Sequence, residues 1–86
     1  MKKMTIMVVN ESGLHARPAA MLTELAQTFE SEITIVSSDT QADAKSIIDL
    51  LSSGFNKGME IDVIAEGADE ETAIVAVCKL ISGFTE

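Results

Sequence analysis

The stretch MTIMVVNESGLHARPAAMLTELAQTF, residues 4–29, contains a strand pattern, a loop and a helix pattern in direct succession. Met4 to Val9 is apolar enough for a strand that is buried on much of both faces, and residues 10–13 form a loop that ends in a glycine. From about Ala16 to Thr28 the apolar residues recur every three or four positions, which predicts a helix. The apolar face of this helix consists of Leu22, Leu25, Ala26 and Phe29. Pro18 falls in its first turn, where a missing N–H does no harm.

The middle of the chain continues the alternation with shorter elements. Ile33 to Val36 is rich in β-branched residues and predicts a strand, and a turn over residues 37–39 leads to a weak return strand from Thr40 to Asp43. Ser46 opens a second, short helix, which Gly54 is suited to end. Two strands joined by so short a turn are expected to be antiparallel neighbours.

The last third of the chain predicts one more strand and one more helix. Residues 60–65 alternate in a way that predicts a strand with one better-buried face. Asp69 is the expected N-cap of the final helix, and Glu70 and Glu71 suit its positive end. The apolar face of this helix is expected to consist of Ala73, Ile74, Val77, Leu80, Ile81 and Phe84. The order β-α-β-β-α-β-α predicts an α+β fold with a mainly antiparallel sheet and helices on one face.

The composition limits the classes of protein to which the chain can belong. Its 86 residues suit a single domain, residues 1–86, and with no Trp or Tyr the core must be mainly aliphatic. The net charge of −8 argues against a nucleic-acid partner, because phosphate neutralisation requires clustered Lys and Arg. No apolar run approaches the roughly 18 to 20 residues that cross a bilayer, so we expect no membrane insertion. A single cysteine, Cys78, excludes an internal disulfide and fits a reducing, cytoplasmic location.

The segment Gly13-Leu14-His15-Ala16-Arg17-Pro18-Ala19 has the most chemical content. The start of a helix attracts anions, and the guanidinium of Arg17 can bind phosphate oxygens through two N–H groups. Both features disfavour a positive charge on His15, so we expect a neutral, nucleophilic imidazole that gains stabilisation once it holds a phosphoryl group. A lone histidine near a helix start is often an exposed residue without a role, and on these residues alone both interpretations stay open.

The same segment resembles the active-site signature of the HPr family, the histidine-containing phosphocarriers of the bacterial phosphoenolpyruvate:sugar phosphotransferase system. Lys45-Ser46-Ile47 resembles the regulatory serine segment of that family, at the same distance from the histidine. Further agreement is found at Gly54, at Lys57-Gly58 and at Gly67-Ala68-Asp69-Glu70. The resemblance extends over essentially the whole chain.

The resemblance implies both a fold and a chemistry. The fold is an open-faced β-sandwich, with a four-stranded antiparallel sheet and three helices on one face. Enzyme I, phosphorylated by phosphoenolpyruvate, would phosphorylate His15 on Nδ1, and His15 would pass the group to EIIA domains of sugar permeases. Arg17 would stabilise the phosphate, and Ser12 would lie in the active-site loop. The resemblance implies no metal and no organic cofactor, and a carrier that is itself a substrate is expected to show no independent turnover.

A docking surface is expected beside the histidine. Exposed apolar side chains next to a reactive group mark such surfaces, and aliphatic and Met side chains adapt to unlike partners. The candidate residues are Ala20, Met21, Ile47, Ile48 and Leu51. The alternative, that these five residues belong to the ordinary core, stays open.

Ser46 has two interpretations. The segment Ser46-Ile47-Ile48-Asp49 has the capping-box pattern with Asp in place of Glu, which makes Ser46 an N-cap. The resemblance instead implies a regulatory site for the HPr kinase/phosphorylase, whose product binds a transcriptional regulator. Asp49 stands where the family commonly has Gly, and its carboxylate would repel a phosphate on Ser46. We therefore favour the N-cap.

Other departures from the family pattern widen the choice of partners. Residues 40–43 are more polar and acidic than usual, so a paralogous, nitrogen-related or other regulatory phosphotransfer branch is an alternative to sugar uptake. An HPr-like adaptor that transfers no phosphate is a second alternative, against which the presence of both His15 and Arg17 argues. A ligand-binding or assembly domain with a chance motif is a third. We expect a monomer.

Overall fold

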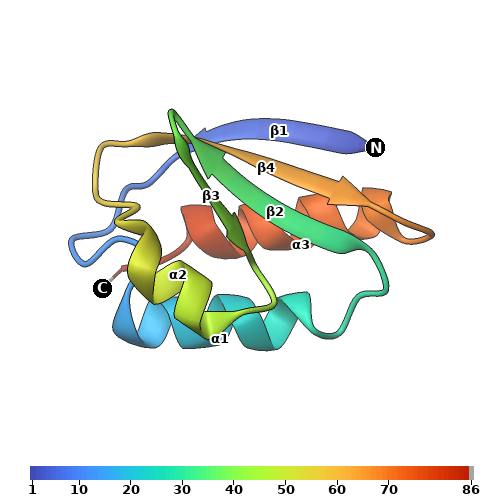
Figure 1. The fold of residues 1–86 in the computed structure, drawn as a ribbon, viewed down its shortest axis with the longest axis horizontal. Coiled ribbons are helices and arrows are strands. Elements are labelled where there is room, and N and C mark those ends of the chain that lie inside the picture. The colour runs from blue at the N-terminus through green and yellow to red at the C-terminus, as the bar shows by residue number, and fades with distance from the viewer. Residues whose placement is uncertain (86) are drawn as a thin grey trace.

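The computed structural model describes residues 1–85, and within them strands and helices follow the expected order (Figure 1). The elements are β1 (Lys2–Met7), α1 (Ala16–Ala26), β2 (Glu32–Ser37), β3 (Thr40–Asp43), α2 (Ile47–Ser53), β4 (Glu60–Glu66) and α3 (Glu70–Ser82). The predicted return strand at residues 40–43 is confirmed as β3.

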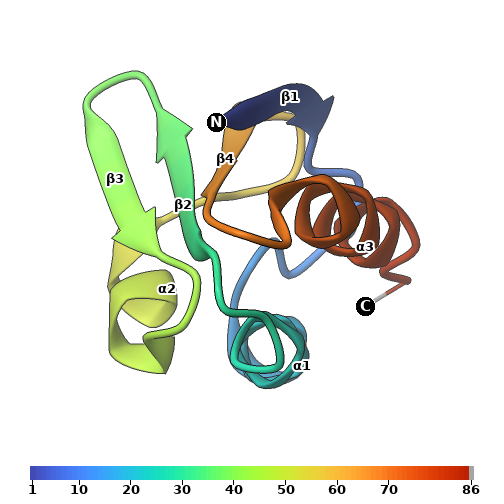
Figure 2. The same ribbon diagram turned by 90° about the vertical axis from the view of Figure 1, so that its right-hand side faces the viewer.

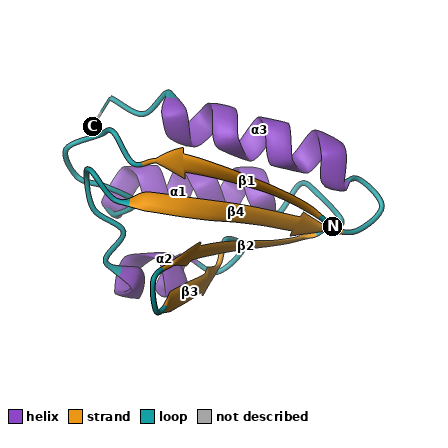
Figure 3. Ribbon diagram, turned by 90° about the horizontal axis from the view of Figure 1, so that it is seen from above, coloured by secondary structure: helices purple, strands orange, loops and turns teal. Residues whose placement is uncertain are grey.

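The four strands form one antiparallel sheet in the order β1-β4-β2-β3. Figures 2 and 3 show the three helices on one side of this sheet, with the other side uncovered. The fold is therefore the expected α+β open-faced sandwich. In the central pair, Ile33 lies opposite Ala65 and Ile35 opposite Val63, and all four side chains are buried. Alternation along β2 and β4 thus directs one row of aliphatic residues toward the helices.

The core between sheet and helices is aliphatic, as the composition predicts. Phe55, which is 2% exposed, is its one fully buried aromatic side chain in the described residues. From α1 the core receives Ala19, Leu22 and Ala26, with Leu25 and Phe29 partly buried against it. The predicted apolar face of α1 is confirmed, although the helix ends at Ala26 rather than Thr28, because the N–H groups of Thr28 and Phe29 bond three residues back.

The prediction that the first strand is buried on much of both faces is wrong. Met4 is 41% exposed and Met7 is 52% exposed. Met4 pairs with the buried Val63, so it lies on the helix-facing side, whereas Met7 falls on the uncovered side. The physical reason is the place of β1 in the sheet, because an edge strand has one neighbour and this sheet has one bare face.

The start of α3 also differs from expectation. Asp69 occupies the N-cap position, but its side chain does not cap the helix. Its carboxylate accepts hydrogen bonds from the backbone N–H groups of Glu30 and Ser31, both at 2.9 Å, and from the Ser31 hydroxyl. These bonds lower the pKa of Asp69, the Ser31 hydroxyl contributing most. Asp69 therefore joins α3 to the turn that precedes β2.

The remaining helix predictions are mostly confirmed. Gly54 ends α2 with φ +75°, a left-handed conformation. Ala73, Ile74, Val77 and Ile81 of α3 are buried. Leu80 and Phe84 are only partly buried, and Phe84 lies beyond the end of α3 at Ser82.

Candidate functional site

The loop between β1 and α1 is held by backbone contacts to the segment that follows α2. The Leu14 N–H donates to the Phe55 carbonyl at 2.9 Å. Gly13 has φ +65°, and a Cβ at this position would lie 2.2 Å from the Phe55 oxygen. Only glycine fits so close an approach in this conformation. These contacts fix the backbone at Leu14, one residue before His15.

His15 stands immediately before α1, at its N-cap position. Its backbone is extended, with φ −132° and ψ 161°, and its exposed side chain makes no capping hydrogen bond. The next residue, Ala16, has φ +50°, a left-handed conformation that is strained for a residue with a Cβ. The imidazole is thus presented outward at the positive end of an 11-residue helix, as the sequence predicts.

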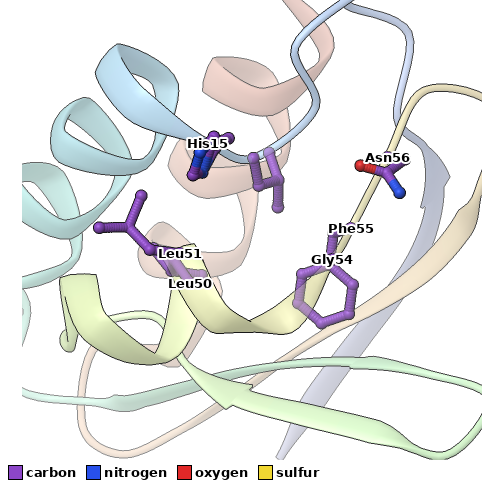
Figure 4. A pocket seen from close by; sticks show the side chains of 7 residues that line it. His15, Leu50, Leu51, Gly54, Phe55 and Asn56 are labelled. Carbon is purple, nitrogen blue, oxygen red and sulfur yellow. The ribbon is translucent and has the colours of Figure 1, made fainter.

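A pocket of about 220 Å³ lies beside the imidazole (Figure 4). It is lined by Leu14, His15, Leu50, Leu51, Gly54, Phe55 and Asn56. The loop before α1 and the C-terminal end of α2 therefore meet at His15. The lining is mainly apolar, and the Asn56 side chain adds one polar group.

Arg17 and Ser12 flank the histidine on either side in the chain. Arg17 is exposed in the first turn of α1, and Ser12 is exposed in the loop. Next to Ser12, the Glu11 carboxylate accepts a 2.6 Å hydrogen bond from Lys57 Nζ, which lowers the pKa of Glu11. The ion pair is a second link between this loop and the segment after α2.

The five predicted docking residues are all exposed and are divided between α1 and α2. Ile47, Ile48 and Leu51 lie on α2, with Ile48 73% exposed, and Leu51 also lines the pocket beside His15. Ala20 and Met21 lie on α1. Met21 lines a separate hollow, together with Leu25 and Leu80, at the side of α1 that faces α3. The apolar surface therefore extends on two sides of α1.

Ser46 lies at the other end of α2 from the pocket. Its Oγ accepts the Asp49 N–H at 3.3 Å, so the N-cap is confirmed. The capping box is not completed, because the Asp49 carboxylate accepts the Asp43 N–H at 3.1 Å instead of the N–H of Ser46. The Ser46 N–H donates to the Asp43 carbonyl. The structure therefore does not place Ser46 in the pocket with His15.

Three residues that support the site were not singled out from the sequence. Phe55 and Asn56 line the pocket, and Asn10 is buried and hydrogen-bonded to Gly13. A polar residue that directly follows a run of apolar strand residues was the only local sign for Asn10. Phe55 and Asn56 had none, because their role depends on contact with a loop some forty residues earlier in the chain.

Within residues 1–85, no group of three or more His, Cys, Asp or Glu side chains is arranged to hold a metal ion. None of the helices described is long and apolar enough to cross a membrane.

An open-faced sandwich that presents a histidine at the start of its first helix defines a class of small phosphocarrier proteins. The family profile described as "PTS HPr component phosphorylation site" matches residues 2–83. Phosphocarrier protein NPr of Escherichia coli (strain K12) is 44% identical over 86 residues, covering 98% of this chain and 96% of the relative. Phosphocarrier protein HPr of Treponema pallidum (strain Nichols) is 37% identical over 82 residues, covering 95% and 93%. The crystal structure of HPr-C-His from Thermoanaerobacter tengcongensis superimposes with a TM-score of 0.91 at 43% identity, covering 95% and 92%.

The chain therefore belongs to the HPr family of phosphocarrier proteins of the phosphotransferase system.

Proposed function

We propose that His15 accepts a phosphoryl group from phosphorylated enzyme I and passes it to an EIIA domain. The lone pair of Nδ1 attacks phosphorus, a P–N bond forms, and the bond between phosphorus and the donor atom of enzyme I breaks. The reverse sequence, with an EIIA side chain as the nucleophile, releases the group. The chain ends each cycle unchanged, so it is a carrier without independent turnover.

The observation that supports this role most is the placement of an exposed imidazole at the N-cap of α1 with no capping bond of its own. The positive end of the helix favours the negative charge that arrives with the phosphoryl group. Arg17, two residues on, adds a guanidinium suited to phosphate oxygens. We assign phosphate stabilisation to Arg17 and a loop position beside the phosphate to Ser12.

The docking surface of this carrier is proposed to centre on α2. Leu51 connects the pocket at His15 to Ile47 and Ile48, which are exposed on the same short helix. Ala20 and Met21 extend the apolar surface onto α1. Apolar groups around a small reactive centre exclude water and leave specificity to the rim. We propose transfer by a monomer in the cytoplasm.

Phosphoryl transfer is tested with enzyme I and phosphoenolpyruvate. The wild-type chain should acquire an acid-labile, base-stable phosphate, and His15→Ala should acquire none. Arg17→Ala should still be phosphorylated on His15, but transfer should be slower by about a hundredfold. This is the usual effect of losing one group that stabilises developing charge. Phosphorylation of His15→Ala at the wild-type level would contradict the assignment.

A regulatory phosphotransfer branch is a second candidate, favoured by the charges around the docking surface. Asp49 is exposed beside Ile48, and Glu24 lies on the exposed side of α1, one turn after Ala20. The nearby Lys45 Nζ is bound to the Phe29 carbonyl at 2.7 Å. An acidic rim favours partners with basic rims. Faster transfer to a regulatory EIIA domain than to a sugar-specific one would support this branch.

A further inference from the structure

Asn10 lies in the loop before His15, yet only 3% of it is exposed. Its Nδ2 donates to the Gly13 carbonyl at 2.8 Å, and its own carbonyl accepts the Gly13 N–H at 3.1 Å. Its Oδ1 is buried without a hydrogen-bond partner among residues 1–85. Because a buried amide with an unpaired oxygen costs free energy, stability alone does not explain an asparagine at this position.

The side-chain hydrogen bond of Asn10 is one half of a clamp on a single peptide group. The peptide between Gly13 and Leu14 has its oxygen bound to Asn10 Nδ2 and its N–H bound to the Phe55 carbonyl at 2.9 Å. The close approach of Gly13 to Phe55 blocks movement on that side. A peptide held at both polar atoms and packed against backbone has a fixed plane. The direction in which the chain enters His15 is therefore fixed as well.

The backbone just after His15 requires such a support. Ala16 has φ +50°, and an alanine stays in this conformation only where the surrounding structure leaves no easier one. On the N-terminal side that constraint comes from the clamped peptide and the buried Leu14, which is 1% exposed. On the C-terminal side it comes from the helix itself, with Pro18 and Ala19 buried. His15 is thus held between two rigid supports while its own side chain stays exposed.

From these contacts we infer that Asn10 is a positioning residue for phosphoryl transfer. Its side-chain amide orients the Gly13–Leu14 peptide, and this orientation sets the line along which the His15 ring meets phosphorus. The inference rests on the proposed role of His15. Misplacement of a reacting group by about 1 Å can slow a reaction by about a hundredfold, so one lost hydrogen bond in the clamp suffices for a measurable effect.

Asn10→Leu separates positioning from stability. Leucine keeps the branched shape of asparagine but has neither the donor that binds Gly13 nor the unpaired oxygen. We expect the urea midpoint of unfolding to stay close to that of the wild type, because the unpaired Oδ1 is removed while the Gly13 carbonyl loses its donor. With phosphorylated enzyme I as donor, kcat should fall about tenfold or more, whereas KM for the chain should stay unchanged because the docking residues are untouched. The final yield should remain one phosphoryl group per chain.

Gln27→Leu is the matched control. Gln27 also donates a side-chain amide to a backbone carbonyl, that of Lys45 at 3.2 Å, but at the far end of α1 from His15. The Gln27→Leu variant should accept the phosphoryl group with the wild-type kcat. Asn10→Asp is the second variant should leucine prevent folding. It puts an acceptor against the Gly13 carbonyl, and it should also lower kcat.

The outcomes distinguish the inference from the function on which it rests. A wild-type chain that takes no phosphoryl group contradicts the proposed function, and the inference falls with it. If the wild-type chain is phosphorylated and a folded Asn10 variant has the same kcat, only the inference about Asn10 is overturned. A slowed Gln27→Leu variant, or a change confined to KM, also overturns it.

Discussion

At position 13 the chain passes so close to Phe55 that a methyl group does not fit. The same contact brings the pocket-lining segment after α2 against the loop that presents His15. Contacts between backbone atoms, rather than contacts of the His15 side chain, therefore fix the geometry of the site.

Gly13→Ala should lower the free energy of unfolding by about 2 to 3 kcal/mol, which combines a left-handed alanine with a backbone collision. Gly54→Ala is the control, because Gly54 has φ +75° but no atom within 4 Å of the added Cβ. It should lose only the conformational part, about 1 kcal/mol. Urea unfolding of both variants measures the difference, and equal losses would show that the contact with Phe55 contributes nothing.

Arg17→Lys tests the geometry of phosphate binding at His15. Lysine keeps the charge of Arg17 but lacks the planar fork that donates two parallel hydrogen bonds. Transfer from phosphorylated enzyme I should be slower than in the wild type by about tenfold and faster than in Arg17→Ala. If the lysine variant equals the wild type, charge alone accounts for the role of Arg17.

Among the elements, α2 has an aspartate in its first turn and α3 has one at its N-cap position, and the bonds of each reach another segment. Asp49 of α2 binds the Asp43 N–H, and Asp69 before α3 binds the turn at residues 30–31. These contacts attach α2 to the end of β3 and α3 to the turn that precedes β2. Replacing either carboxylate should therefore have a measurable effect, on stability for Asp69 and on the phosphorylation of Ser46 for Asp49.

Asp69 should make stability depend on pH in acid. Its pKa is lower in the folded chain than in the unfolded one, so the unfolded state binds more protons. The stabilisation is therefore present above the ordinary pKa of an aspartate and is lost as pH falls through the lowered pKa. The difference in urea midpoint between the wild type and Asp69→Asn should shrink over that acid range. A difference that is constant down to the lowest pH would contradict the role of these bonds.

Asp49 should protect Ser46 from phosphorylation by the HPr kinase/phosphorylase. A phosphate on Ser46 Oγ would lie against the Asp49 carboxylate, which is already fixed one turn into α2. Asp49→Asn should raise the rate of Ser46 phosphorylation about two- to fivefold, the effect of removing one exposed like charge. Asp39→Asn, in the exposed turn between β2 and β3, should leave it unchanged. Equal rates of Ser46 phosphorylation in the wild type and both variants would contradict this role of Asp49.

At the scale of the whole molecule, the helices cover one face of the sheet and the site lies where α1, α2 and their flanking loops meet (Figures 2 and 4). The exposed apolar side chains of α2 adjoin this meeting point, whereas Val75 on α3, 58% exposed, does not line the pocket. Val75 is therefore a suitable control position for a test of the docking proposal.

Ile48→Asp should lower kcat/KM for transfer from enzyme I by about tenfold or more, mainly through KM, because it puts a charge on the docking surface. Val75→Asp introduces the same charge at another exposed apolar position, on α3, and should leave kcat/KM unchanged. The kinetics of both variants are compared at one salt concentration. Unchanged kinetics in Ile48→Asp would remove α2 from the docking surface.

Local patterns predicted the element order, the position of His15 and the caps at Ser46 and Gly54, because each depends on neighbours within a few residues. The exposure of β1 was not predictable in this way, since it depends on which strand lies at the sheet edge. The same holds for Asp69, whose partners lie 38 and 39 positions away, and for the peptide clamp to Phe55. Long-range contacts decide the details of the site, while short-range patterns decide its class.

The position of the phosphoryl group, which we propose to be the His15 ring, can be observed directly. The chain is phosphorylated by enzyme I and phosphoenolpyruvate, and the imidazole nitrogens are followed by nitrogen NMR before and after. The Nδ1 resonance of His15 is expected to shift and to couple to phosphorus while the serine side chains stay unmodified. A phosphate found on Ser12 or Ser46, or an unchanged His15 ring in a phosphorylated chain, would contradict the proposal.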